Sequence, residues 1–355
     1  MAFKFINESA NEEERRYKGI LADAIAFRRK HVHRNFLKEV IERHRDDFDK
    51  LWIDQSDMDT DLKLKVSSLS AVDGSKCNQK LQAYPIFAVR AVSIPFSKNG
   101  NTLPIILEKM DVLIPHEKYE DRTILYMEGL EAEIHGFTVD RLRSIELMLM
   151  DGMFSVASRC KEVLEKYGCE PFDGGLVELL DYIKSNNLDA GTAIKIECGW
   201  KKNLYKEVAE RANNVLTIYV GKSFLSNELF GDNILTDIGI INILAKDKVG
   251  MTKPQRITTV VGCKKYRKEV TLTRSYMKLS KNGAPLTVEV IGSYDEVEMN
   301  KIFNFLRRTS LKGYPLPLTQ AHRKSKISNA ECDLILSRAL PTFVSELIRT
   351  GREAL

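Results

Sequence analysis

Several features that would define the class of this 355-residue chain are absent from its sequence. The 6 cysteines form no Cys-x-x-Cys pair and no Cys/His spacing of a zinc finger, so we expect buried free thiols. No run of about 20 apolar residues could span a bilayer, and residues 1–10 lack the apolar segment of a signal peptide. No internal repeat or low-complexity tract divides the chain. We therefore expect a globular protein of the cytoplasm, without a membrane partner.

Charge of one sign does not dominate either. The formal net charge is +5 and 43% of the residues are hydrophobic, so the chain can bury a large core. Basic residues gather at residues 28–34, 264–281 and 323–326. Each of these clusters could neutralise phosphates along DNA or could be an ordinary solvated face. The balance therefore permits a nucleic-acid partner without requiring one.

The N-terminal part of the sequence predicts helix. Residues 9–50 are rich in Glu, Arg, Lys, Ala and Leu, and their apolar members recur at helical spacing. We expect one long helix or a helix pair inside an N-terminal helical segment over residues 1–65, with a role in packing or assembly. The remainder, residues 66–355, carries the candidate chemistry.

Two aspartates are the most informative residues. Asp73 and Asp151 each close an apolar strand, and each is followed by glycine. The predicted elements are, in order, strands over residues 68–72, 85–95 and 102–114, an acidic helix over 118–135 that ends near Gly136, and a buried strand over 145–150. The first three strands would form an antiparallel meander, and the fourth could lie beside the first. This is the order of a ribonuclease-H-like core.

That order would bring several carboxylates together. Asp73, Asp151 and a glutamate of the intervening helix, Glu128 or Glu131, would converge from separate elements. Divalent ions held by oxygen ligands can activate water and stabilise the charge of a phosphodiester under attack. Taken singly, an Asp-Gly pair is commonly a turn, and helical glutamates are commonly solvated. Their combination in this order favours a metal-dependent nuclease.

Beyond Asp151 the pattern becomes α/β. Further elements are predicted as helices over residues 153–167, 176–185 and 205–213, a strand over 215–220, a helix over 233–245 that carries Asp237, and helices over 295–308 and 329–349. A basic, β-rich insertion over about residues 255–292 would either extend the sheet or face DNA. The fold class is therefore α/β, with a mixed sheet and flanking helices.

Two further residues could take part in the chemistry. Lys222 follows an apolar strand, so its ammonium group could reach a phosphate or a developing oxyanion; it could equally be a surface lysine. Pro315 and Pro317 set an extended entry to a helix, which would place His322 in its first turn. There His322 could be a metal ligand, a proton shuttle or a packing residue.

The chain resembles the NurA family of DNA nucleases, which act beside the HerA hexameric translocase in DNA end resection. The resemblance rests on segments at residues 71–75, 150–152, 220–223 and 313–328, in that order. It implies a ribonuclease-H-like fold, Mn²⁺ as cofactor with Mg²⁺ as an alternative, and cleavage of single-stranded DNA with 5′–3′ exonuclease action at DNA ends. It also implies a homodimer and a HerA-type hexameric ATPase as partner.

The resemblance also implies roles for individual residues. Matched by position, Asp73 and Asp151 would be metal ligands, Lys222 a phosphate or transition-state contact, and His322 the last member of the site. Both Glu128 and Glu131 fit the helical ligand, so both are kept. Asp237 resembles a family acid. Residues 152–154 depart from the family, which often has a small polar residue and leucine there, and this departure concerns substrate geometry.

Two other classes of protein compete with the nuclease. An actin-like or sugar-kinase-like nucleotide-binding enzyme shares the meander, but it needs glycine-rich phosphate loops, usually in two related halves, which this sequence lacks. A non-catalytic DNA-binding or assembly protein on the same fold would use the basic segment at residues 264–281 equally well.

Overall fold

The computed structural model describes residues 38–55, 62–80, 85–97, 100–101, 103–222, 226–232, 234–328 and 330–334. The chain divides into two compact units. One comprises Met1–Trp52 with Leu225–Lys246, and the other comprises Ile53–Phe224 with Asp247–Leu355. The basic segment at residues 28–34 and most of the predicted C-terminal helix lie outside the described residues.

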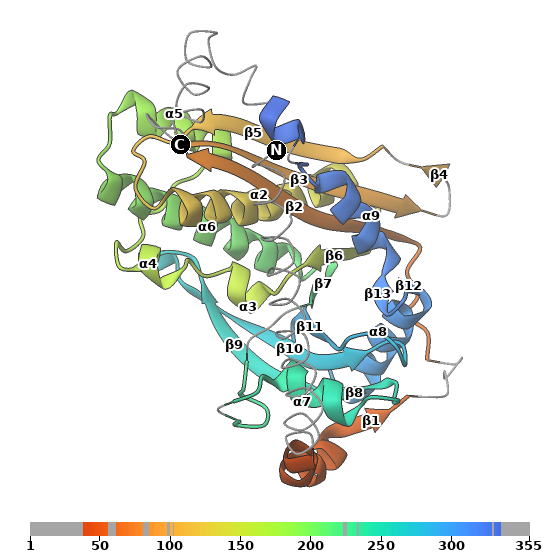
Figure 1. Cartoon of the computed structure of the whole chain (residues 1–355). Coiled ribbons are helices and arrows are strands. Elements are labelled where there is room, and N and C mark those ends of the chain that lie inside the picture. The colour runs from red at the N-terminus through yellow and green to blue at the C-terminus, as the bar shows by residue number, and fades with distance from the viewer. Residues whose placement is uncertain are drawn as a thin grey trace, which may run out of the picture. The chain divides into compact units, whose positions relative to one another are not determined.

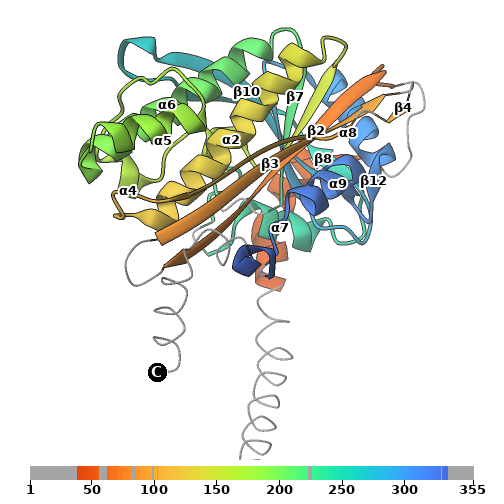
Figure 2. The same cartoon turned by 90° about the horizontal axis from the view of Figure 1, so that it is seen from above.

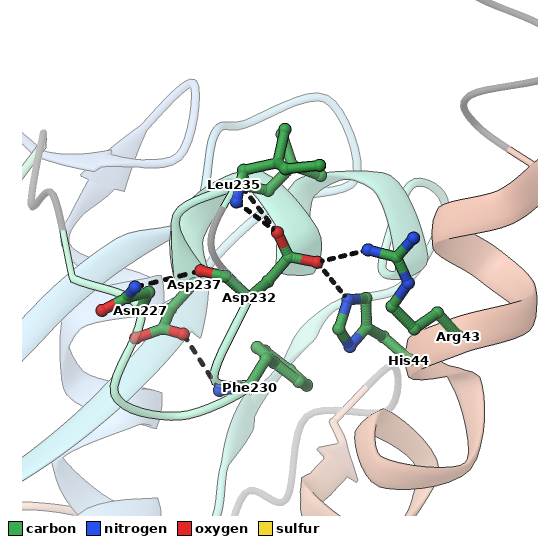
Figure 3. Close-up of polar contacts among 8 residues, drawn as sticks. Arg43, His44, Asn227, Phe230, Asp232, Leu235 and Asp237 are labelled. Atoms are coloured by element: carbon green, nitrogen blue, oxygen red, sulfur yellow. Dashed lines mark hydrogen bonds and ion pairs between the residues drawn. The ribbon is translucent and has the colours of Figure 1, made fainter.

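The first unit contains a helix over residues 38–51 and the short helix α7 (Asp237–Leu244). Asp232 joins its two segments, because its Oδ2 lies 2.8 Å from Nε2 of His44 and 3.0 Å from Nη1 of Arg43 (Figure 3). Asp237 accepts hydrogen bonds from the backbone N–H groups of Leu229 and Phe230. The carboxylate of Asp237 therefore holds a loop of this unit.

The second unit is built on a large mixed sheet (Figure 1). Within the described residues the order of its strands is β1-β8-β10-β11-β7-β6-β2-β3-β4, with β5 paired to β3 and β9 to β10. The strands are β1 (Trp52–Asp54), β2 (Ser68–Lys80), β3 (Pro85–Ser97), β4 (Gly100–Asn101), β5 (Ile105–Val112), β6 (Leu147–Asp151), β7 (Leu216–Gly221), β8 (Gly250–Thr252), β9 (Gln255–Val261), β10 (Lys268–Lys278) and β11 (Leu286–Ile291).

The predicted meander and its neighbour are confirmed. β2, β3 and β5 pair antiparallel, and β6 lies parallel to β2 on one side and to β7 on the other. Parallel strands need a crossover connection, which here is the helix α2 (Tyr119–Arg141). The apolar run of β6 is buried because its side chains point alternately into the two hydrophobic cores on either face of the sheet.

Helices cover both faces of this sheet (Figure 2). On one face α2 and α6 (Ala190–Arg211) pack together, with α5 (Leu176–Ser185) beside them. A Cβ on Gly129 of α2 would lie 2.3 Å from the ring of Trp200, so the missing side chain permits the close approach of α2 and α6. On the other face lie α8 (Glu296–Arg308) and α9 (Leu316–Ser325), which a short hairpin of β12 (Ser310–Leu311) and β13 (Tyr314–Pro315) connects.

Several helix predictions needed correction. The predicted end of α2 near Gly136 was wrong, because the helix continues to Arg141 and buries Thr138, whose hydroxyl reaches Ser93. The helix predicted over residues 153–167 is instead two short ones, α3 (Phe154–Ala157) and α4 (Glu162–Glu165). The helix predicted over residues 205–213 is the last part of α6, whose first turns are buried and lack a clear apolar stripe.

The basic region after residue 255 extends the sheet, the first of the two predicted alternatives. Arg274 and Lys278 belong to the basic cluster at residues 264–281, for which both a DNA track and a solvated face were considered, but both side chains are buried. The Arg274 guanidinium donates to Glu289 Oε1, which is also buried, at 2.9 Å. These side chains therefore belong to the core and are not part of an exposed basic track.

The cysteine prediction was wrong for most of the cysteines. Disulfides join Cys77 to Cys332 and Cys169 to Cys263, whose Cα atoms lie 6.2 and 5.9 Å apart. Only Cys160 and Cys198 are free among the described residues, and both are buried. The partners are 255 and 94 positions apart, so no local spacing signals them. Across the described ranges, every helix is too short or too polar to cross a bilayer.

Candidate metal centre

Asp73 and Asp151 lie side by side on neighbouring strands. β2 and β6 pair in parallel with Val72 opposite Met150, so the next residue of each strand is an aspartate at the same level. Asp151 is the last residue of β6, as predicted. Asp73 does not end its strand, however, because β2 continues to Lys80 and pairs with β3 throughout. The prediction that this strand ends at Asp73 was therefore wrong, although the two carboxylates do meet.

Helix α9 supplies the next two side chains. Nδ1 of His322 lies 2.9 Å from Oδ2 of Asp73, and the buried hydroxyl of Ser325 donates to the same oxygen at 2.6 Å. Ligand atoms of Asp73, Asp151 and His322 all lie within 4.8 Å of one another, close enough to share one ion. His322 stands near the end of α9, not in its first turn as predicted, because the helix begins directly after Pro315.

The helical glutamates of α2 have different surroundings. Glu131 is buried against β2, and a Cβ on Gly74 would lie 2.4 Å from its Oε1. Asp73 faces α9, whereas Glu131 comes from α2 on the other face of the sheet. Because Gly74 has no side chain, the carboxylate of Glu131 can occupy the space beside β2 and approach the aspartates. Glu128 instead accepts a 2.5 Å hydrogen bond from Nζ of Lys201, whose side chain is 1% exposed.

Tyr314 and Lys222 complete the surroundings of Asp151. The Tyr314 hydroxyl donates to Oδ1 of Asp151 at 2.5 Å, and Lys222 Nζ lies 3.6 Å from Oδ2 of the same carboxylate. The ammonium group also lies 4.2 Å from the centre of the Tyr314 ring, a cation–π distance. Lys222 remains about half exposed and can meet an incoming anion.

Burial and mutual repulsion of the carboxylates define the electrostatics. Desolvation, followed by the charge of Asp151, raises the pKa of Asp73 to about 6, although the hydrogen bond from Ser325 and the charge of His322 oppose this rise. Desolvation and the charge of Asp73 raise the pKa of Glu131 well above its usual range. Without a counter-charge, the surroundings therefore shift the protonation equilibria of Asp73 and Glu131 toward their neutral forms. A bound cation would reverse this shift.

These side chains line a single cavity of about 360 Å³. Each predicted site residue is on its wall: Asp73, Glu128, Glu131, Asp151, Lys222 and His322. Asp237, by contrast, belongs to the other compact unit.

Sequence reasoning missed Tyr314 and Ser325. Tyr314 stands just before Pro315 and Pro317, within the segment at residues 313–328 that carries the family resemblance. An aromatic hydroxyl at that place in the sequence could have indicated a role in the site. Ser325 carries no comparable signal, since it reaches Asp73 only through the path of α9 across β2.

Comparison with known proteins agrees with this geometry. A family model described as the NurA domain matches residues 67–327. This chain belongs to the NurA family. The match spans β2 to β13 together with α2 and α9, and therefore contains each side chain of the cavity described above.

Among curated proteins, the chain is similar to NurA proteins of several species. It is 24% identical over 281 residues to the DNA double-strand break repair nuclease NurA of Saccharolobus solfataricus, covering 75% of this chain and 78% of that protein. It is also 24% identical over 324 residues to the protein of the same name in Sulfolobus acidocaldarius, covering 84% of this chain and 88% of the relative.

Solved NurA structures share the fold. The crystal structure of the NurA nuclease from Sulfolobus solfataricus matches with a TM-score of 0.68 at 19% identity, covering 90% of this chain and 95% of that one. A NurA crystal structure with bound dAMP and manganese matches with a TM-score of 0.56 at 14% identity, covering 89% of this chain and 96% of the other. At these identities the likeness concerns the fold alone.

Proposed function

We propose that this protein is a DNA nuclease whose active site is the cavity around Asp73 and Asp151. The observation that carries the proposal is the convergence of Asp73, Asp151 and Glu131 with His322 from four separate elements. Membership of the NurA family supports it, since the curated relatives named above are described as DNA double-strand break repair nucleases.

The residues fit a divalent metal. Their donors are carboxylate oxygens and one imidazole, which suit Mn²⁺ or Mg²⁺ better than a soft metal. The raised pKa values of Asp73 and Glu131 provide an independent argument, because crowded buried carboxylates gain most from a cation. We propose Mn²⁺, which a related NurA structure contains, held by Asp73, Glu131, Asp151 and His322.

The protein's own groups have separate proposed roles. The hydrogen bond between Asp73 and Nδ1 of His322 orients the imidazole ring, so that Nε2 can bind a metal ion or transfer a proton. Tyr314 orients Asp151, and Lys222 meets a non-bridging phosphate oxygen. Glu128 holds the buried ammonium group of Lys201 and keeps this wall of the cavity in place. When bound, divalent ions supply an activated water and neutralise charge on the phosphate.

The fold also supports finer assignments. We infer a ribonuclease-H-like core from the β2-β3-β5 meander, the crossover through α2, and the parallel strands β6 and β7. On this basis we propose residues 66–355 as the nuclease domain, with the β-rich part at about 255–292, and residues 1–65 as a separate N-terminal segment. In the described part of that segment, a helix over residues 38–51 is followed by β1 (Trp52–Asp54). We also propose the cytoplasm as its location, where a nuclease of DNA repair would meet its substrate.

The resemblance supports more specific activities and partners. We propose endonuclease action on single strands, 5′–3′ exonuclease action at DNA ends, a homodimer, and a HerA-type hexameric ATPase as partner in end resection. Co-purification of the full chain with such an ATPase and sedimentation of the purified protein test the two assemblies. End-labelled duplexes test the polarity.

The deciding experiment is a cleavage assay on single-stranded oligonucleotides with Mn²⁺, Mg²⁺ or a chelator. We expect cleavage with Mn²⁺ in the wild type and at least a 100-fold loss in Asp151→Asn. Asp181→Asn, an exposed aspartate on α5, is the matched control and should cleave normally. Full activity of Asp151→Asn would refute the site. A wild type that binds DNA but leaves it intact with both metals would favour the non-catalytic alternative.

A further inference from the structure

A second and larger cavity of about 520 Å³ opens beside the metal centre. Its walls come from α4, α6, β9 and the loop between α3 and α4, which group together in the second unit (Figure 1). Its charged lining residues are Arg159, Glu165, Lys202 and Arg267. None of these residues takes part in the chemistry proposed above.

We propose that this cavity binds a backbone phosphate of the DNA strand whose scissile bond lies at the metal centre. The proposal rests on the nuclease function and adds a second subsite to it. The two sites would then divide their tasks, with cleavage at the carboxylates and retention of the strand at the arginines.

The two cavities are adjacent along the chain and in space. Ala157 lines the metal-centre cavity, and Arg159, two residues later, lines the second one. Two residues span at most about 7 Å. Lys201 fixes this spacing, because its Nζ donates to Glu128 Oε2 at 2.5 Å and to the carbonyl oxygen of Arg159 at 2.7 Å. A single strand therefore needs only a few nucleotides to reach from one cavity to the other.

The charge of the second cavity suits phosphate. Nζ of Lys202 lies 3.1 Å from Oε1 of Glu165, so these two residues form an ion pair and add no net charge to the cavity. Arg159 and Arg267 are exposed, and within the described ranges neither forms an ion pair. The cavity therefore keeps a net positive charge carried by guanidinium groups, whose planar fork matches the oxygens of a phosphate.

A buried hydroxyl adds a further polar group. Thr259 lines the cavity and is 2% exposed, and its Oγ1 has no hydrogen-bond partner in the described part of the chain. A buried hydroxyl without a hydrogen-bond partner destabilises the fold. A rotation of its side chain toward a bound phosphate oxygen would remove this destabilisation.

The walls of the cavity are cross-linked. The disulfide between Cys169 and Cys263 joins the segment after α4 to the segment that follows β9. The backbone N–H of Gly262 donates to the carbonyl of Lys202 in α6 at 3.1 Å. A cavity held in this way is preformed, so binding a strand costs little reorganisation.

The test compares Arg159→Ala/Arg267→Ala with Arg141→Ala/Arg143→Ala, which removes the same charge from exposed positions just before the opposite end of β6. Binding is measured by fluorescence anisotropy in an Asp151→Asn background, with a thymidine 20-mer and a dinucleotide. We expect the cavity variant to bind the 20-mer about tenfold more weakly, with the salt slope reduced by about 0.7 for the one lost phosphate contact. The dinucleotide, which cannot reach both cavities, should bind unchanged.

Equal 20-mer affinity and equal salt slope in the two double variants would overturn the subsite. So would an equal loss for the dinucleotide, because that would indicate a disturbed metal centre. These readouts need no cleavage. If the wild type binds but does not cleave DNA, the nuclease proposal fails while the binding comparison still decides whether the cavity holds phosphate.

Discussion

Tyr314 donates a 2.5 Å hydrogen bond to Oδ1 of Asp151, across a separation of 163 residues. Desolvation and the nearby charge of Asp151 raise the pKa of the Tyr314 phenol, so it stays protonated and remains a donor at physiological pH. The hydrogen bond connects the segment that leads into α9 with the end of β6. The orientation of one carboxylate therefore depends on a residue that is not itself an acid.

Tyr314→Phe removes this donor and keeps the ring that packs beside Lys222. We expect nuclease activity to fall by about 10–100-fold, the usual effect of losing a group that orients a metal ligand. The melting temperature should change little. Activity is measured with Mn²⁺ on a single-stranded oligonucleotide, with the metal titrated. Wild-type activity at every metal concentration would show that Asp151 needs no such support.

Substitutions of the two glutamates of α2 should have different effects on metal binding and on stability. We expect Glu131→Gln to abolish the stabilisation that Mn²⁺ gives the wild type, which is about 2.7 kcal/mol at 100 times the dissociation constant. Glu128→Gln should keep that response. It should instead lower the free energy of unfolding by about 3 kcal/mol, because it leaves the ammonium group of Lys201 buried and unpaired. Denaturant titrations with and without Mn²⁺ measure both effects, and the reverse pattern would exchange the two assignments.

Gly74→Ala tests whether Glu131 needs the space beside β2. The added Cβ would lie 2.4 Å from Glu131 Oε1, so the carboxylate must move. We expect Mn²⁺ binding to weaken at least tenfold, measured by calorimetry. Gly191→Ala, the same substitution near the start of α6, is the control and should bind Mn²⁺ normally. Unchanged binding in Gly74→Ala would mean that Glu131 is not a ligand.

The pKa of about 6 for Asp73 predicts a pH dependence of stability. A carboxyl group whose pKa is raised in the folded state stabilises the fold fully below its unfolded pKa, near 4, and loses this contribution as the pH rises through 6. Metal-free protein should therefore become less stable between pH 4 and 7. Stabilisation by Mn²⁺ should grow over the same interval, because the ion competes with protons.

Asp73→Asn should reduce this pH dependence and raise the melting temperature of the metal-free protein at pH 8. Thermal melts from pH 4 to 8 with a chelator provide the measurement. A slope equal to that of the wild type would assign the dependence to other carboxyl groups, with buried Glu131 the first to be tested.

The sequence predicts the part of the fold that follows from regular patterns. The alternating and apolar runs of β3, β6 and β7 have strand periodicity, and α5 was predicted with its observed bounds because its apolar residues recur along one face. Two predicted element ends, both placed at a glycine, were wrong. Gly74 lies inside a strand and Gly136 inside a helix, and in both places a neighbouring side chain occupies the space that a Cβ would fill.

The two aspartates of the site could be predicted because each directly follows a recognisable apolar run, and Glu131 because it lies on the acidic helix between them. Its supporting residues could not, because their roles depend on contacts between distant segments. Ser325 is 252 positions from Asp73, and Lys201 is 73 positions from Glu128. The sequence alone also cannot show whether a basic residue such as Arg274 forms a buried ion pair or belongs to an exposed basic surface. The difference depends on its partner Glu289, which the fold brings beside it.

The position of Asp73 in the interior of β2 limits how this region can diverge. Successive side chains of a strand alternate between faces, so inserting or deleting one residue between Ser68 and Asp73 would turn the carboxylate from the α9 side to the α2 side. The strand cannot absorb such a change in a loop near the aspartate, because its pairing with β3 continues to Lys80. Insertions and deletions among relatives of this protein should therefore lie outside Ser68–Lys80, even where substitutions are frequent.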